Sequence, residues 1–110
     1  MIVKLQRNHS HYPELTAHRN YVVIGVEADD LRILNDEGRP YLYPRELFEI
    51  SQSHEPNDWV TEFGDEGERY AYPPALNEPG FFEDFFDSKK EAVSAFWQLI
   101  NQQLATALAA

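Results

Sequence analysis

The strongest strand signal in the chain is NYVVIGVEA, which occupies residues 20–28. Residues 21–26 at its centre are β-branched or apolar at both odd and even positions. A half-exposed strand alternates apolar and polar residues, whereas a strand covered on both faces does not. The stretch therefore predicts a central strand, and the other elements are placed around it.

Short apolar runs separated by turn residues surround this strand. Residues 1–5 predict an opening strand, and residues 7–19, which hold Pro13 and three histidines, read as a loop. In the turn 35–38, NDEG, Gly38 can take a positive φ. The remaining predictions are a turn at 29–30, a half-buried strand at 31–34, strands at 40–44 and 47–50 joined by a short turn at 45–46, and a hairpin of 59–63 with 69–72 around GDEGE at 64–68.

The last third of the chain is helical in character. Phenylalanines at 81, 82, 85 and 86 share one helical face, which is more often the lid of a core than an exposed stripe for a partner. Ser88 and Glu91 match a capping box, which predicts Ser88 as the N-cap of a longer helix. The apolar stripe of that helix is Val93, Phe96, Trp97, Ile100, Leu104 and Leu108, with Ser94, Gln98, Asn101 and Gln102 opposite.

Strands first and helices last indicate an α+β fold. We expect a small bent antiparallel sheet or an SH3-like β-barrel, followed by a short Phe-rich helix and a longer C-terminal amphipathic helix. With 110 residues the chain is near the commonest domain size. Residues 1–110 are therefore expected to form a single domain, β-rich over 1–74 and helical over 75–110.

Charge and composition narrow the class of function. The formal net charge is −10, which repels the phosphate backbone and anionic lipid, so we expect no nucleic acid and no membrane as partner. A basic protein surface is compatible with this charge, although acidic charge can also serve solubility alone. The chain has no cysteine, signal peptide or membrane-spanning run, so the expected location is the cytoplasm.

The sequence carries no recognisable catalytic motif. The patterns G-x-S-x-G, G-x-x-x-x-G-K-[ST], G-x-G-x-x-G and H-E-x-x-H are all missing, so we expect neither enzyme activity nor a cofactor. His9 and His11 share a face of an extended segment, with His18 as a third potential zinc ligand, but surface histidines are the commoner case. The acidic loops at 36–38 and 65–68 lack the ligand spacing of an EF-hand.

The acidic residues gather at predicted turns. If alternate hairpin tips meet at one end of the sheet, their carboxylates form a negative patch that steers and holds a cationic partner. The alternative is that these turns are acidic only because turns are polar. Trp59 begins a predicted strand and is either a core residue or an aromatic anchor for the partner. The candidate partner-binding residues are Glu27, Asp29, Asp30, Asp36, Glu37, Trp59, Asp65 and Glu66.

Residues 21–43, together with 47–50 and 58–60, resemble small bacterial proteins with SH3-like barrels. The resemblance extends over about residues 20–86 and carries no functional residue with it. Some acidic proteins of this size act as cytoplasmic immunity partners of secreted toxins. The resemblance thus implies an SH3-like barrel and, for function, an immunity protein.

Three functions remain open at this point. The first is a non-catalytic acidic module, such as an immunity protein or inhibitor, that occludes a basic protein surface. The second is a small metal-binding protein or metal-dependent enzyme that uses the N-terminal histidines. The third is a self-associating structural module, in which residues 81–86 or the Trp97 helix make a homodimer.

Overall fold

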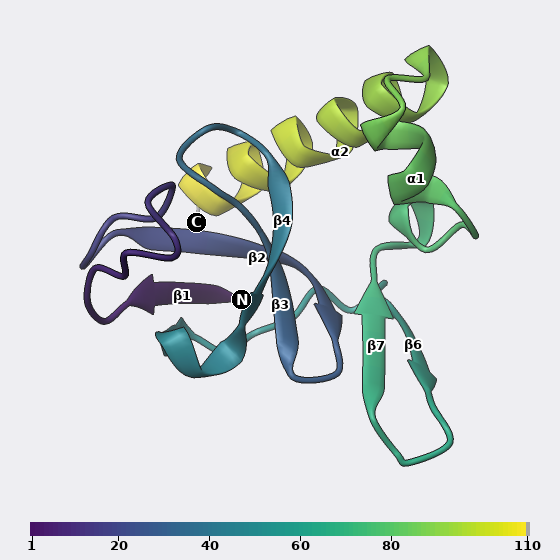
Figure 1. The fold of residues 1–110 in the computed structure, drawn as a ribbon. Coiled ribbons are helices and arrows are strands. Elements are labelled where there is room, and N and C mark those ends of the chain that lie inside the picture. Colours follow the sequence, from purple (N-terminus) through teal and green to yellow (C-terminus); the bar gives the residue numbers. More distant parts are fainter. Residues whose placement is uncertain (110) are drawn as a thin grey trace. The chain divides into compact units, whose positions relative to one another are not determined.

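A computed structural model describes residues 1–109 of the chain, with side chains through Gln103 and at Ala105. The chain divides into two compact units, Met1–Pro73 and the residues from Pro74 onward. The first unit holds all the strands and the second holds both α-helices (Figure 1). This order confirms the α+β prediction, whereas a single domain over residues 1–110 stays a prediction.

Seven antiparallel strands make up the sheet of the first unit. The order β4-β3-β2-β1-β5 forms its main path, and β7 joins β2 to β6. The sheet is open, because β4 and β5 lie at the two ends of this path; the bent sheet is therefore observed, and a closed barrel is not. The strands are β1 (Ile2–Leu5), β2 (Asn20–Glu27), β3 (Asp30–Leu34), β4 (Pro40–Pro44), β5 (Phe48–Gln52), β6 (Val60–Phe63) and β7 (Arg69–Tyr72), with a 3-10 turn, η1 (Arg45–Leu47), before β5.

β2 is the central strand that its sequence predicts. Its first residues pair with β1, and from Val23 onward it pairs with β3, with an irregular register between Val23 and Gly25. Such a bulge bends a strand, which lets β2 belong to both halves of the sheet. Tyr21, Val23, Ile24 and Val26 are all buried, so β2 shows no solvent face along its centre. The core packed around it comprises Val3, Leu5, Leu15, Tyr21, Val23, Val26, Leu31, Ile33, Tyr43, Leu47, Phe48 and Ala71.

The tripeptide Asp-Glu-Gly occurs twice and makes the same turn each time. In the β3–β4 turn the Gly38 N–H donates to the Asn35 carbonyl at 2.9 Å, and Gly38 has φ of 74°. In the β6–β7 turn the Gly67 N–H donates to the Gly64 carbonyl at 3.0 Å, and Gly67 has φ of 81°. Both are three-residue hairpin loops that end on a left-handed residue, where glycine avoids steric strain. The sequence predicts both turns correctly.

The strand predicted at 31–34 is confirmed, but the prediction that it is half-buried is wrong. Leu31, Arg32 and Ile33 are consecutive buried residues, and Arg32 is only 8% exposed. The guanidinium is covered because Tyr72, Glu27 and the carbonyl of Pro40 all bind it. A charged residue in an alternating pattern normally faces water, so this side of β3 is not visible from the local sequence.

The second unit contains η2 (Pro74–Leu76), α1 (Phe81–Phe86) and α2 (Lys90–Ala109). Phe85 and Phe96 pack with ring centroids 4.7 Å apart, and Phe82 lies 6.3 Å from Phe96, so the Phe-rich helix covers α2 as a lid does. Phe86 is 42% exposed, and its ring lies 5.3 Å from that of Phe85 at the margin of this face. No described helix is long and apolar enough to cross a membrane.

The predicted N-cap at Ser88 is wrong. Ser88 has φ of 60°, its N–H donates to the Phe85 carbonyl, and the Lys89 N–H donates to the Asp84 carbonyl. These two bonds form a Schellman motif, so Ser88 ends α1 instead of starting α2. Of the predicted stripe on α2, Phe96 and Ile100 are buried and Val93 and Trp97 half-buried, while Leu104 and Leu108 lie outside the described side chains.

Candidate functional site: the acidic end of the sheet

Two of the three acidic turns lie at the same end of the sheet. β7 pairs antiparallel with β2, with Tyr70 opposite Glu27, and the Ala28 N–H donates to the Arg69 carbonyl at 2.8 Å. The β2–β3 turn is therefore beside the start of β7, which is the end from which the β6–β7 turn projects (Figure 1). Because β3 runs away from this end, the β3–β4 turn with Asp36 lies at the opposite end.

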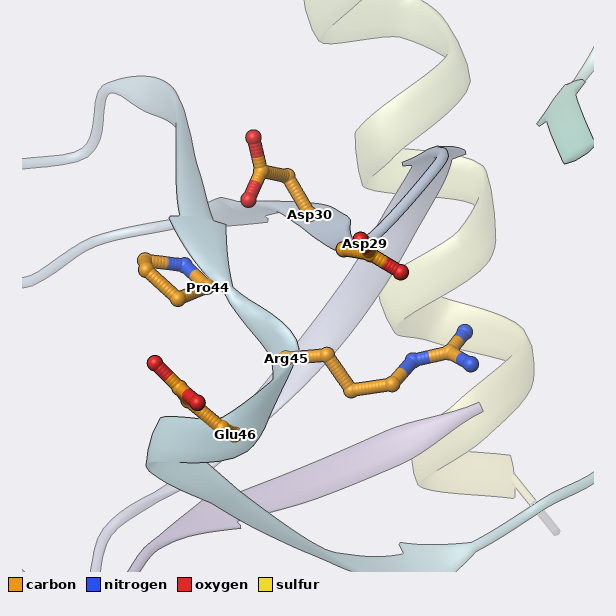
Figure 2. A pocket seen from close by; sticks show the side chains of 5 residues that line it. All are labelled: Asp29, Asp30, Pro44, Arg45 and Glu46. Carbon is orange, nitrogen blue, oxygen red and sulfur yellow. The ribbon is translucent and has the colours of Figure 1, made fainter. Parts of the chain in front are cut away.

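A further carboxylate joins this end from the 3-10 turn η1. The Arg45 N–H donates to the Asp29 carbonyl at 2.9 Å, which ties η1 to the β2–β3 turn. An open hollow of about 560 Å³ lies between them, lined by Asp29, Asp30, Pro44, Arg45 and Glu46. The side chains of Asp29 and Arg45 extend to one side of it and those of Asp30 and Glu46 to the other (Figure 2).

We define the acidic end as Asp29, Asp30, Glu46, Asp65 and Glu66. Within the described part of the chain, none of these five carboxylates makes an ion pair or accepts a side-chain hydrogen bond. Asp29, Glu46, Asp65 and Glu66 are exposed and Asp30 is half-buried. Arg45 is the cation in their midst, so the acidic end keeps a net negative charge that faces solvent.

Glu27, by contrast, is half-buried, and its carboxylate is bound by other side chains of the protein. Its carboxylate accepts hydrogen bonds from Arg32 Nη2 at 2.9 Å and from the Tyr72 hydroxyl, which also accepts from Arg32 Nε at 2.7 Å. Burial raises the pKa of Tyr72 well above its usual value near 10 and outweighs the opposing effect of Arg32. The phenol therefore stays protonated and serves as a donor. Glu27 belongs to this internal network and not to the binding surface that the sequence suggests.

The Asp36 carboxylate is also bound by other side chains of the protein, at the other end of the sheet. Its carboxylate accepts from Thr16 Oγ1 at 2.6 Å and from the Tyr21 hydroxyl at 2.8 Å, and it lies 3.0 Å from Arg19 Nη1. These bonds fasten the 7–19 loop to the β3–β4 turn. Glu37 beside it is exposed, but the length of β3 separates both residues from the acidic end.

We expect Asp36→Asn to reduce the free energy of unfolding by about 1–2 kcal/mol, because the amide loses the charge that faces Arg19 and one of two acceptor oxygens. Urea unfolding measures this loss, and amide hydrogen exchange at Thr16 reports the loop itself. The matched control is Glu37→Gln, an exposed neighbour that should change stability by less than about 0.5 kcal/mol. Equal effects of the two variants would show that Asp36 does not hold the loop.

Trp59 packs against the core of the first unit, together with Met1 and Tyr12. It is half-buried, and its indole N–H is buried with no hydrogen-bond partner among the residues that the structure describes. Of the two interpretations left open by the sequence, core residue and partner anchor, the packing of Trp59 favours the core residue.

The histidines are not gathered into a ligand set. His9 is half-buried with its ring 6.1 Å from that of Tyr12, and His11 is exposed. His18 takes a left-handed conformation, and its N–H donates to the Leu5 carbonyl. No group of three or more His, Asp or Glu among the described residues is arranged to hold a metal ion.

The residues that sequence reasoning missed are Arg45 and Glu46. They read only as a short turn between two strands, and no local pattern marks them as part of a surface. The signal available was topological, since in an antiparallel sheet the turn after β4 returns to the end where β3 begins.

Comparison of the chain with known proteins gives no match among family models, curated proteins or solved structures.

Proposed function

We propose that the chain is a non-catalytic binding module whose acidic end occludes a basic surface on a protein partner. One observation carries the proposal: among the described residues, the carboxylates of Asp29, Asp30, Glu46, Asp65 and Glu66 have no cation paired with them, whereas those of Glu27, Asp36 and Glu55 each have one. Unpaired charges on one surface attract an oppositely charged partner without the cost of breaking an internal ion pair.

The local turn structure supports this proposal. Gly67 closes the β6–β7 turn and the Arg45 N–H fastens η1 to the β2–β3 turn, so the carboxylates are held on hydrogen-bonded turns. A surface that is ordered before binding loses less conformational entropy when the partner docks. With a net charge of −10, the long-range field also favours encounter with a cationic protein.

The class of partner follows from two arguments of different origin. The charge indicates a basic protein. The resemblance to small bacterial SH3-like proteins, together with the immunity role of some acidic proteins of this size, favours a secreted toxin as that protein and a cytoplasmic immunity protein as this chain. We adopt that assignment as part of the proposal. The metal-binding and self-association hypotheses stay predictions.

Affinity capture from the source cells tests the proposal, with mass spectrometry to identify the partner. Three baits are compared: the wild type, an acidic-end variant (Asp29→Asn, Asp30→Asn, Glu46→Gln), and a control that removes the same charge from the second unit (Glu78→Gln, Glu83→Gln, Asp87→Asn). We expect the wild type and the control to recover one basic protein at low salt and to lose it at high salt. Recovery of the same protein by the acidic-end variant would contradict the proposal.

A further inference from the structure

Three strands of the first unit, β4, β5 and β6, have an edge that no other described strand pairs with. An open edge presents unpaired backbone N–H and C=O groups and invites another strand, so most proteins block such edges. β4 is bounded by Pro40 and Pro44, which remove donors. β5 carries a bulge, since consecutive residues Ile2 and Val3 of β1 face Gln52 and Ile50. β6 has neither device.

The hydrogen-bond pattern shows which groups of β6 point outward. The Gly64 N–H donates to the Glu68 carbonyl at 2.9 Å, so Gly64 turns its backbone groups toward β7. Backbone groups alternate along a strand, so Glu62 and Val60 also face β7, whereas Thr61 and Phe63 face away from it. Neither Thr61 nor Phe63 has a backbone hydrogen bond outside the β6–β7 pairing within the described chain.

The side chains of β6 are suited to packing against a further strand. All of its residues are exposed, with Phe63 at 70% and Val60 at 36%. Val60 and Glu62 lie on one face of the strand, and Thr61 and Phe63 lie on the other. β-branched and aromatic residues on both faces would pack against the side chains of an added strand.

The acidic residues in and around β6 favour a basic segment as the strand that would pair with this edge. Glu62 lies within β6, Asp58 precedes it and Asp65 and Glu66 follow it, while the nearby cation Arg69 is bound to Glu55. A second copy of the chain would bring the same set of carboxylates to the shared edge, where like charges repel one another. An extended segment that alternates basic and apolar residues matches both the charge and the exposed side chains.

We propose that β6 receives an extended basic segment of the partner as an additional antiparallel or parallel strand, held by the outward backbone groups of Thr61 and Phe63. The proposal rests on the proposed function and states how the partner is held once the acidic end has attracted it. Backbone pairing fixes the segment, Glu62 faces a basic side chain, and Phe63 on the other face of the strand faces an apolar one.

Two ten-residue peptides of alternating lysine and valine test the proposal on the full, ¹⁵N-labelled chain. The second peptide is N-methylated at four consecutive central residues, which keeps its charge but blocks backbone donors on both of its edges. We expect the methylated peptide to bind at least about tenfold more weakly. The unmodified peptide should also slow hydrogen exchange of the Thr61 and Phe63 amides. No binding of the unmodified peptide, or protection confined to β5, would overturn the proposal.

Phe63→Lys supplies a variant that places a cation on the edge, and we expect it to weaken the unmodified peptide at least about tenfold. Its control is Ile50→Lys on the bulged edge of β5, where Ile50 is 53% exposed, and this variant should bind as the wild type does. Equal binding of both peptides, lost only in the acidic-end variant, would overturn strand addition while leaving the proposed function intact. Concentration-dependent shifts of the Thr61 and Phe63 amides without peptide would identify a second copy as the occupant instead.

Discussion

Replacement of Gly25 by alanine is expected to lower the free energy of unfolding of the first unit by about 3 kcal/mol, at the upper end of the range for overpacked sites. A Cβ at this position would lie 2.0 Å from Cε1 and 2.4 Å from Cδ1 of Tyr72. The ring cannot move without losing its contacts, because it is buried and its hydroxyl is bonded to Arg32 and Glu27. The strand β2 or the ring must therefore shift, and both lie at the centre of the sheet.

Urea unfolding followed by Trp59 fluorescence measures this effect, with all variants carrying Trp97→Phe so that only the first unit is observed. The control is Gly38→Ala, where an added Cβ meets nothing within 4 Å but φ is 74°. That backbone strain should cost about 1 kcal/mol. If Gly25→Ala costs no more than Gly38→Ala, the Tyr72 ring does not pack on Gly25 as described.

Arg32→Met is expected to cost about 3 kcal/mol, because it removes one member of a buried charged network. The side chain of Arg32 is 9% exposed and donates hydrogen bonds to the Tyr72 hydroxyl, the Pro40 carbonyl and the Glu27 carboxylate. Without the guanidinium, the Pro40 carbonyl loses its donor and the Glu27 carboxylate loses its cation. The Glu27 side chain is 31% exposed and its charge can still be solvated, which keeps the cost at the lower end of the range for such pairs.

A double-mutant cycle separates this coupling from lost packing. Glu27→Gln removes the charge that Arg32 neutralises, so the double variant should cost at least about 1 kcal/mol less than the sum of the two single variants. The same urea unfolding assay applies. Additive effects would mean that Arg32 contributes by packing alone and that its contact with Glu27 has no energetic weight.

Local patterns suffice to predict most of the fold. Residues 20–28, the two Asp-Glu-Gly turns and the phenylalanines of α1 each carry a periodicity or turn chemistry that determines local structure. Ser88 shows the limit, because Ser-x-x-Glu fits a capping box, yet the tight connection from α1 places Ser88 in the left-handed conformation that ends the first helix. The conformation of Ser88 is set by the end of α1, and the Ser-x-x-Glu motif contains no residue of that helix.

The candidate site is harder to predict because its members are selected by long-range pairing. Asp29 and Asp65 reach the same end of the sheet only because β7 pairs with β2, and no residue pattern specifies that choice. Asp36 looks like them in sequence but is occupied by Thr16 and Tyr21, whose contacts depend on how the 7–19 loop folds back. The order of residues along the chain predicts that carboxylates gather at turns, whereas only the structure shows which of them are without an ion-pair partner among the described residues.

Capture of a basic protein on the acidic end is tested most directly by the association rate constant of the recovered partner, measured by stopped flow from about 50 to about 500 mM salt. We expect the rate constants of the wild type and of the second-unit control to fall at least about tenfold over this range. The acidic-end variant should associate slowly throughout. A rate constant that is independent of salt, or equal among the three proteins, would contradict electrostatic capture by this surface.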